Sequence, residues 1–420
     1  MSADQSPVPT PDPGPRGTDR WQHVARAAGL LDADGTVRPT IFAEMSALAA
    51  RTGALNLGQG FPDVDGPASV ARAAADAIAA GANQYPPGPG IPALREAIAA
   101  HQERRYGLCP DPDSEVLVTA GATEALAATV LALAGPGDEV LTLEPFYDAY
   151  AAVIAMAGAT HTTAPLRATP DGFRLDAQAL AAAFTDRTRL VLLNTPHNPT
   201  GAVLTREELA VVADLATRHD ALVVTDEVYE HLVLDADRAH VPIATLPGMA
   251  ERTLTVSSAG KTFSFTGWKI GWVSGPAALV DAVRTVKQFL TYVSGAPFQP
   301  AVAFALQDEG VAAWVEGLVA SLAHRRDLLC EGLTAAGFTV ARPQGTYFVL
   351  ADAAPLGFDD GARFCRELPA LAGVVGVPVG AFTHTGSAAD DALRSWVRFT
   401  FVKREEVLVE AVARLQALRR

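Results

Sequence analysis

Cysteine is rare in this chain of 420 residues, positive charge is outnumbered, and long apolar runs are absent. The three cysteines, Cys109, Cys330 and Cys365, lie far apart and show no CxxC or Cys/His spacing, so the sequence predicts neither a disulfide framework nor a metal site. The 33 Lys and Arg residues against 47 Asp and Glu residues give a net charge of −14, which disfavours nucleic acid as a partner. A reducing cytoplasm is the expected location.

No apolar run approaches the roughly 18 to 20 residues that cross a bilayer, so no membrane partner is expected. Prolines alternate with small or polar residues between Pro7 and Pro15. This composition predicts a disordered arm over residues 1–20, and the arm lacks the apolar segment of a signal peptide.

The rest of the chain has the composition of a globular protein and enough length for a large core and a smaller one. From about Val70, short apolar runs alternate with helical stretches, which predicts an α/β fold with a mostly parallel sheet and helices on both faces. The expected strands are residues 115–119, 139–143, 190–194, 222–225, 253–257 and 270–273.

The pattern changes after residue 300. A long helical pattern over residues 311–336 leads to isolated strands near 346–350 and 397–401, and then to a charged helix from Arg404. We therefore expect a smaller α+β domain here. The predicted division is a disordered arm at 1–20, an N-terminal segment at 21–60 that packs with the small domain, a large ligand-binding domain at 61–300 and a small domain at 301–420.

Residues 257–272, SSAGKTFSFTGWKIGW, place Lys261 and Lys269 in an apolar stretch with glycines. A lysine amine becomes a nucleophile toward an aldehyde when burial or a nearby cation lowers its pKa. An isolated loop lysine more often reaches the surface, so this segment needs support from others.

Three other segments suggest a ligand site. Asp226 ends the apolar run ALVVT at the carboxyl edge of a strand, where open α/β sheets bind ligands, although such an aspartate can also cap a helix. The junction TAGATEAL at residues 119–126 would present backbone N–H groups to an anion. Arg398 lies within the apolar strand WVRFT, which requires an anionic partner, either a ligand or an internal carboxylate.

Taken together and in order, these segments resemble class I/II aminotransferases of fold type I, which depend on pyridoxal 5′-phosphate, and most closely their kynurenine/glutamine transaminase subgroup. The resemblance extends from about Phe42 to the C-terminus. It implies a fold type I transferase and a homodimer with shared active sites.

The resemblance implies roles around the cofactor ring. Lys261 would hold pyridoxal phosphate as a Schiff base and move the substrate proton. Asp226 would keep the ring nitrogen protonated, and Tyr229 and Asn198 would reach the 3′ oxygen. Tyr147 would stack on the ring. For Tyr229, an ordinary core tyrosine is the alternative.

The resemblance also implies a set of phosphate ligands. Lys269 stands where many relatives carry arginine. A lysine there cannot make the two parallel hydrogen bonds that a guanidinium makes to a phosphate. Tyr85 matches a residue that reaches the neighbouring subunit's cofactor phosphate. The ligands from the same chain would be Gly121, Ala122, Thr123, Ser258 and Lys269.

For the substrate, Arg398 matches the arginine that grips the α-carboxylate, with Asn194 and Gly60 beside it. Phe42 stands where the kynurenine subgroup often has tryptophan, and Tyr292 where it has the first residue of a Phe-His pair. These departures favour a substrate other than kynurenine.

The segments FAEMSAL at 42–48, NQYPPGPG at 83–90 and GAPFQP at 295–300 are similar to those of actinobacterial N-succinyldiaminopimelate aminotransferases of lysine biosynthesis. We therefore expect transfer of an amino group from an L-amino acid donor to 2-oxoglutarate by a ping-pong mechanism. The alternative is a broad kynurenine, glutamine, methionine or aromatic aminotransferase with β-lyase activity on cysteine conjugates. A lyase or decarboxylase of the same fold and a cofactor-sensing regulator are the other possibilities.

Overall fold

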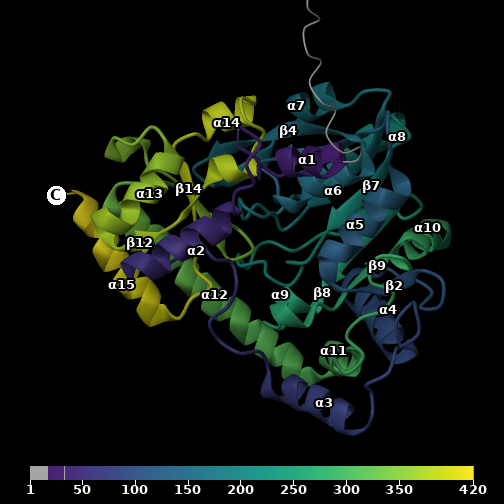
Figure 1. Ribbon diagram of the computed structural model, residues 1–420. Helices are drawn as coiled ribbons and strands as arrows, with labels where there is room; N and C mark the ends of the chain where they lie inside the picture. The colour runs from purple at the N-terminus through teal and green to yellow at the C-terminus, as the bar shows by residue number, and fades with distance from the viewer. Residues whose placement is uncertain (1–17, 33, 420) are drawn as a thin grey trace, which may run out of the picture.

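The computed structural model describes residues 18–32 and 34–419 (Figure 1). Most of the predicted disordered arm, residues 1–17, lies outside these ranges. Its last three residues, 18–20, form the start of helix α1 (Thr18–Ala27).

Eight strands of the described chain form one large sheet in the order β2-β9-β8-β7-β6-β3-β4-β5. Strands β8, β7, β6, β3 and β4 run parallel, whereas β2, β9 and β5 pair antiparallel with their neighbours. The predicted α/β fold with a mostly parallel sheet is confirmed. The bounds are β2 Val116–Thr119, β3 Glu139–Glu144, β4 Thr160–Thr169, β5 Gly172–Leu175, β6 Thr188–Asn194, β7 Leu222–Asp226, β8 Thr253–Ser258 and β9 Gly271–Ser274.

Alternate side chains of β6 show how both faces of the sheet are covered. Leu190 and Leu192 pack with α5 (Gly121–Leu133), α6 (Ala149–Ala157) and α10 (Ala277–Lys287). Val191 and Leu193 point to the opposite face and pack in the core that includes α7 (Ala177–Ala183) and α8 (Arg206–Arg218). A strand buried on both faces explains the continuous apolar run that marked it in the sequence.

The C-terminal part contains a four-stranded antiparallel sheet in the order β10-β11-β14-β13. The strands expected to be isolated are therefore paired with each other. The long helix α12 (Glu309–Ala336) leads into this sheet, and α13 and α15 pack in the same core (Figure 1). The bounds are β10 Thr339–Ala341, β11 Phe348–Asp352, β13 Val377–Pro378, β14 Trp396–Thr400, α13 Gly361–Ala372 and α15 Glu405–Leu415.

The predicted N-terminal segment at residues 21–60 does not pack as one unit. Helix α1 contacts α6 of the large sheet region (Figure 1). Helix α2 (Ile41–Thr52) instead buries Met45 and Ala49 in the core of the C-terminal part, and β1 (Leu55–Asn56) pairs parallel with β12 (Val374–Val375). The division into domains stays a prediction.

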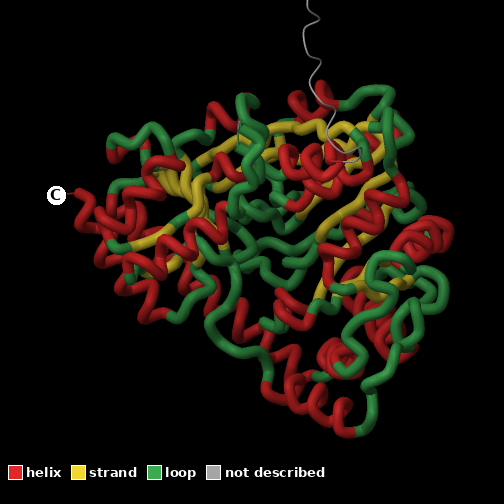
Figure 2. Tube along the Cα trace, viewed as in Figure 1, coloured by secondary structure: helices red, strands yellow, loops and turns green. Residues whose placement is uncertain are grey.

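The carboxyl ends of β6, β7 and β8 meet the start of α5 at one edge of the large sheet, between that sheet and the C-terminal part (Figure 2). No helix of residues 18–32 and 34–419 is long and apolar enough to span a membrane. The other elements are α3 Ala68–Ala79, α4 Pro92–Tyr106, α9 Ala259–Thr262, α11 Phe298–Gln307, α14 Ala388–Ala392 and the 3-10 helices η1 Ile243–Thr245, η2 Thr266–Trp268, η3 Ala354–Leu356, η4 Val379–Phe382 and η5 Gln416–Arg419.

Candidate active site

A cavity of about 190 Å³ lies at this sheet edge and collects most of the residues that the sequence singled out. They come from five separate segments, because parallel strands present their carboxyl ends at one edge. The predicted site residues that line the cavity are Gly121, Ala122, Thr123, Tyr147, Asn194, Asn198, Asp226, Tyr229, Ser258, Lys261 and Lys269.

Lys261 lies on the four-residue helix α9 directly after β8, and its Nζ donates to the hydroxyl of Tyr347 at 3.1 Å. That hydroxyl donates in turn to the carbonyl oxygen of Gly60 at 2.7 Å. The ring of Tyr229 lies 5.6 Å from Nζ. In the described chain no carboxylate lies within 4 Å of the amine, so Lys261 is partly buried but not ion-paired. Such an amine is available to an aldehyde.

Asp226 is buried at the end of β7 and accepts a hydrogen bond of 2.8 Å from the hydroxyl of Tyr150. No helix begins after it, so the helix-cap alternative does not apply. Burial raises its pKa to about 6, while hydrogen bonds from Tyr150 and the Val228 amide and the charge of Lys261 oppose that rise. A cationic group bound inside the cavity would stabilise the charged form of this buried carboxylate.

The opposite end of the cavity suits an anion. Gly121 begins α5 with φ +75°, and a Cβ on it would lie 3.3 Å from Cε of Lys269. A Cβ on Gly271 would lie 2.6 Å from the backbone of Gly121. Two glycines therefore let the helix start, with its free N–H groups, approach the Lys269 ammonium, which reaches within 3.5 Å of the Thr123 hydroxyl.

Arg398 lies on β14 with 2% of its surface exposed. Its Nη1 donates to Oδ1 of Asn198 at 3.1 Å and its Nη2 to the carbonyl oxygen of Gly58 at 3.0 Å, whereas its Nε has no partner among the described residues. None of the carboxylates that the structure describes lies within 4 Å of it, so the internal salt bridge considered from the sequence is not formed. Burial lowers its pKa to about 10, which still leaves it charged at neutral pH.

Phenylalanine rings enclose this guanidinium. The ring centroids of Phe42, Phe348 and Phe382 lie 5.2, 4.1 and 4.7 Å from its central carbon. Gly60 is required beside them, because a Cβ there would lie 2.4 Å from Phe348. The cage holds the cation in an apolar setting where a carboxylate would bind strongly.

Asn194 is occupied by internal contacts. Its Nδ2 donates to the backbone oxygen of Asp226 at 2.7 Å, and its Oδ1 accepts from the amide of Asn198 at 2.6 Å. These bonds fix the loop that carries Asn198. The predicted contact of Asn194 with a substrate carboxylate stays a prediction.

Tyr85 and Tyr292 do not line the cavity. They lie together on the surface with ring centroids 5.5 Å apart and are 81% and 42% exposed. Neither can act at this chain's own cavity as it stands. Four further residues contact the predicted site residues and were not predicted, because none belongs to a recognisable motif: Tyr150, Tyr347, Phe348 and Phe382.

Comparison with known proteins connects this geometry to a family. The family model for aminotransferase class I and II matches residues 52–415. This chain belongs to the class I and II aminotransferases. The family depends on pyridoxal 5′-phosphate, so this aminotransferase is a pyridoxal-phosphate enzyme that acts on amino acids and 2-oxo acids. Its cavity fits that cofactor, with an unpaired amine, a buried carboxylate and an anion-binding end.

Several relatives are close to this aminotransferase. It is 57% identical over 383 residues to the probable N-succinyldiaminopimelate aminotransferase of Mycobacterium tuberculosis, covering 90% of this chain and 96% of the relative. The solved structure of the Mycobacterium tuberculosis N-succinyldiaminopimelate aminotransferase superimposes with a TM-score of 0.87, covering 90% of this chain and 97% of that one. The methionine aminotransferase of Escherichia coli is 41% identical, covering 90% of this chain and 96% of that relative.

Proposed function

We propose that this aminotransferase transfers the amino group of N-succinyl-LL-2,6-diaminopimelate to 2-oxoglutarate in lysine biosynthesis, in the cytoplasm. The observation that carries the proposal is the 57% identity over 90% of the chain to a relative named for that reaction. The caged Arg398 supports a substrate with an α-carboxylate.

When bound, pyridoxal phosphate supplies an aldehyde for amines and a ring that accepts electrons from the substrate α-carbon. Lys261 Nζ would hold the cofactor until an amino substrate takes its place. The freed amine would then accept the proton from the substrate α-carbon. It would return that proton to the carbon on the other side of the transferred nitrogen. Tyr347, which accepts a hydrogen bond from this amine at 3.1 Å, would aim it between the two positions.

The other cavity residues would bind and orient the cofactor. Asp226, held by Tyr150 at 2.8 Å, would keep a proton on the ring nitrogen. Tyr229 and Asn198 would hold the 3′ oxygen and Tyr147 would cover the ring. The phosphate would lie against the start of α5, with Ser258 and Lys269 as further ligands.

At the substrate end, Arg398 would bind the α-carboxylate through N–H groups that have no partner among the described residues, such as Nε. Phe42 would form part of the pocket wall beside it, since its ring already contacts the guanidinium. The backbone at Gly60 would approach the same carboxylate. Asn194 would act through the loop that it fixes.

We further propose a homodimer with shared active sites. Tyr85, Phe289 and Tyr292 are exposed apolar side chains on one surface, and Phe289 is 86% exposed. This surface is linked to the phosphate end, because Thr291 donates to the carboxylate of Glu124, which also accepts from the amide of Ala120. A partner covering this surface would bring its own Tyr85 to the cavity.

A broad-specificity aminotransferase is the second candidate. The 41% identity to a methionine aminotransferase and the three phenylalanine rings around Arg398 favour it. These rings would suit an apolar or aromatic side chain as well as a long succinylated one.

A panel of amino donors separates the two candidates. The purified, cofactor-loaded protein is assayed with N-succinyl-diaminopimelate, kynurenine, methionine, glutamine and phenylalanine, following glutamate formed from 2-oxoglutarate. We expect the succinylated donor to exceed the others by about 100-fold in kcat/KM, or about 2.7 kcal/mol. Equal or higher values for the ordinary amino acids would reject the lysine-pathway assignment in favour of the broad enzyme.

A further inference from the structure

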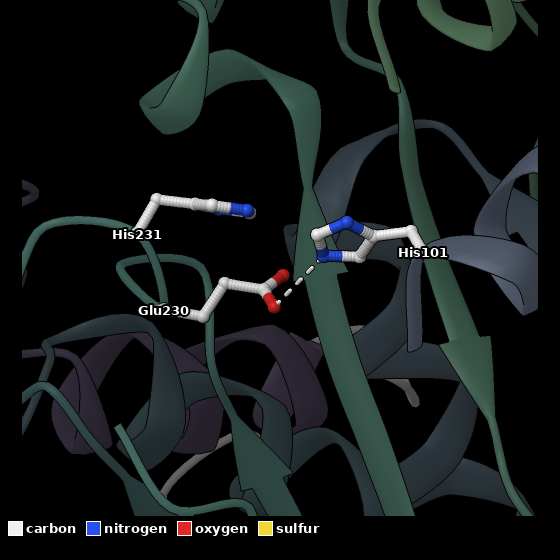
Figure 3. Close-up of side chains that lie close together, drawn as sticks. All are labelled: His101, Glu230 and His231. Atoms are coloured by element: carbon white, nitrogen blue, oxygen red, sulfur yellow. Dashed lines mark hydrogen bonds and ion pairs between the residues drawn. The ribbon is translucent and has the colours of Figure 1, made fainter. Parts of the chain in front are cut away.

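Behind the cofactor cavity, three side chains with metal-binding atoms converge (Figure 3). They are His101 on α4 and the consecutive pair Glu230 and His231 in the loop after β7. One donor atom from each lies within 4.8 Å of the other two. Figure 3 shows the side chains pointing toward one another. His101 and Glu230 are buried, and His231 is partly buried.

The spacing within this cluster suits a shared ion better than a strong hydrogen bond. His101 Nε2 lies 3.3 Å from Oε2 of Glu230, which is long for a charge-assisted hydrogen bond. Two ligands of a tetrahedral Zn²⁺, each about 2.0 to 2.1 Å from the ion, lie about 3.3 Å apart. His231 would move inward to complete the set, and its partial exposure leaves room for that movement.

Neighbouring groups orient these ligands. His231 Nδ1 lies 3.1 Å from the hydroxyl of Thr262, which leaves its Nε2 for an ion. The other oxygen of Glu230 accepts from the hydroxyl of Ser257 at 2.6 Å. Oriented partners of this kind raise the affinity of a metal site. Tyr106 also donates to Oε2 of Glu230 at 2.6 Å, so the ion would share that oxygen with it.

The cluster is accessible from outside. All three side chains line a second cavity of about 770 Å³, formed by α4, the loop after β7, α11 and α12. This cavity does not include Lys261 or Asp226, but it reaches Thr262, the residue after the active-site lysine. An ion can therefore enter without passing through the cofactor cavity.

We propose that His101, Glu230 and His231 form a binding site for a divalent transition-metal ion, with Zn²⁺ as the best fit. Two imidazoles and one carboxylate with a position left for water are a ligand set that Zn²⁺ accepts. The ion would tie α4 to the loop after β7, beside the helix that carries Lys261.

The experiment measures Zn²⁺ bound per chain on the untagged, cofactor-loaded protein. The protein is freed of metal with a chelator, dialysed against Zn²⁺ buffers of fixed free concentration, and analysed by mass spectrometry. We expect about one bound Zn²⁺ per chain in the wild type. We expect His231→Ala to weaken that affinity at least about 100-fold, and Thr262→Val to weaken it about 10-fold.

His324→Ala is the matched control, because His324 is exposed and lies outside the cluster. It should keep the wild-type affinity. Equal binding by the wild type and His231→Ala, or no saturable binding by the wild type, would overturn the proposal. Glu230→Gln, which keeps the side-chain volume, guards against a folding failure and should also lose binding. Co²⁺ in place of Zn²⁺ gives a second test, since tetrahedral coordination produces a visible absorption band that His231→Ala should lack.

Discussion

Two buried arginines occupy opposite situations in this aminotransferase. Arg326 on α12 has carboxylate partners, Asp235 at 2.6 Å and Asp327 at 2.8 Å. Arg398 on β14 is equally buried, yet no described carboxylate pairs with it and its Nε has no partner. Because an unpaired buried charge is destabilising, such a charge persists where a ligand supplies the partner. Arg326 therefore stabilises the fold through its ion pairs, whereas Arg398 is placed to bind a substrate carboxylate.

The largest effect is expected at Lys261, which lines the cofactor cavity. Lys261→Ala should lower kcat by about 10⁴-fold or more, because no other amine would move the substrate proton. The cofactor should remain bound without its covalent link, which an absorbance spectrum can follow. Partial recovery of turnover with added methylamine would show that the amine itself is required. Wild-type turnover in the variant would end the proposed mechanism.

Arg398→Leu should lower kcat/KM by about 10²- to 10³-fold, or about 3 to 4 kcal/mol, because the α-carboxylate loses its charged partner. The melting temperature should change little or rise, since the phenylalanine cage accepts an apolar side chain. Arg398→Lys keeps the positive charge but cannot form two parallel hydrogen bonds to a carboxylate. Its kcat/KM should therefore lie between those of the wild type and Arg398→Leu. Unfolding of Arg398→Leu, with kinetics unchanged in any folded fraction, would assign Arg398 to the fold.

Arg326→Met should give the reverse pattern. We expect the free energy of unfolding to fall by about 3 kcal/mol, since two partly exposed carboxylates lose their buried partner, while kcat/KM stays within about twofold. Arg342→Met is the matched control, because Arg342 contacts the same two carboxylates but its side chain is 45% exposed. Arg342→Met should lower the free energy of unfolding by less than about 1 kcal/mol. Denaturant titration of both variants measures the difference.

Asp226 gives a smaller, pH-dependent effect. Its folded pKa, about 6, lies above the usual value of 3.8, so the stability that it contributes is present below about pH 4 and is lost as the pH rises through 6. In the cofactor-free protein, the free energy of unfolding of Asp226→Asn should therefore rise by about 2 kcal/mol relative to that of the wild type between pH 4 and pH 7. Unfolding at both pH values measures this gain. A difference that is constant with pH would mean that Asp226 does not titrate in this range.

The sequence predicted much of this fold because several strands of the large sheet are buried on both faces and leave continuous apolar runs. It missed β4 and β5, since β4 contains Pro165, is only partly buried and has no such run. The predicted cavity residues mostly come together because strand ends share one edge. Tyr150 and Tyr347 could not be predicted, since their contacts with Asp226 and Lys261 join residues far apart in the sequence.

The phenylalanine cage around Arg398 also affects how solution conditions act on binding. Salt screens charges that water surrounds, and little water reaches a guanidinium enclosed by three rings with 2% of its surface exposed. Lys269, which lines the cofactor cavity, is exposed to solvent. Raising the ionic strength should therefore weaken phosphate binding at Lys269 far more than carboxylate binding at Arg398, so these two cations would respond differently to the same salt.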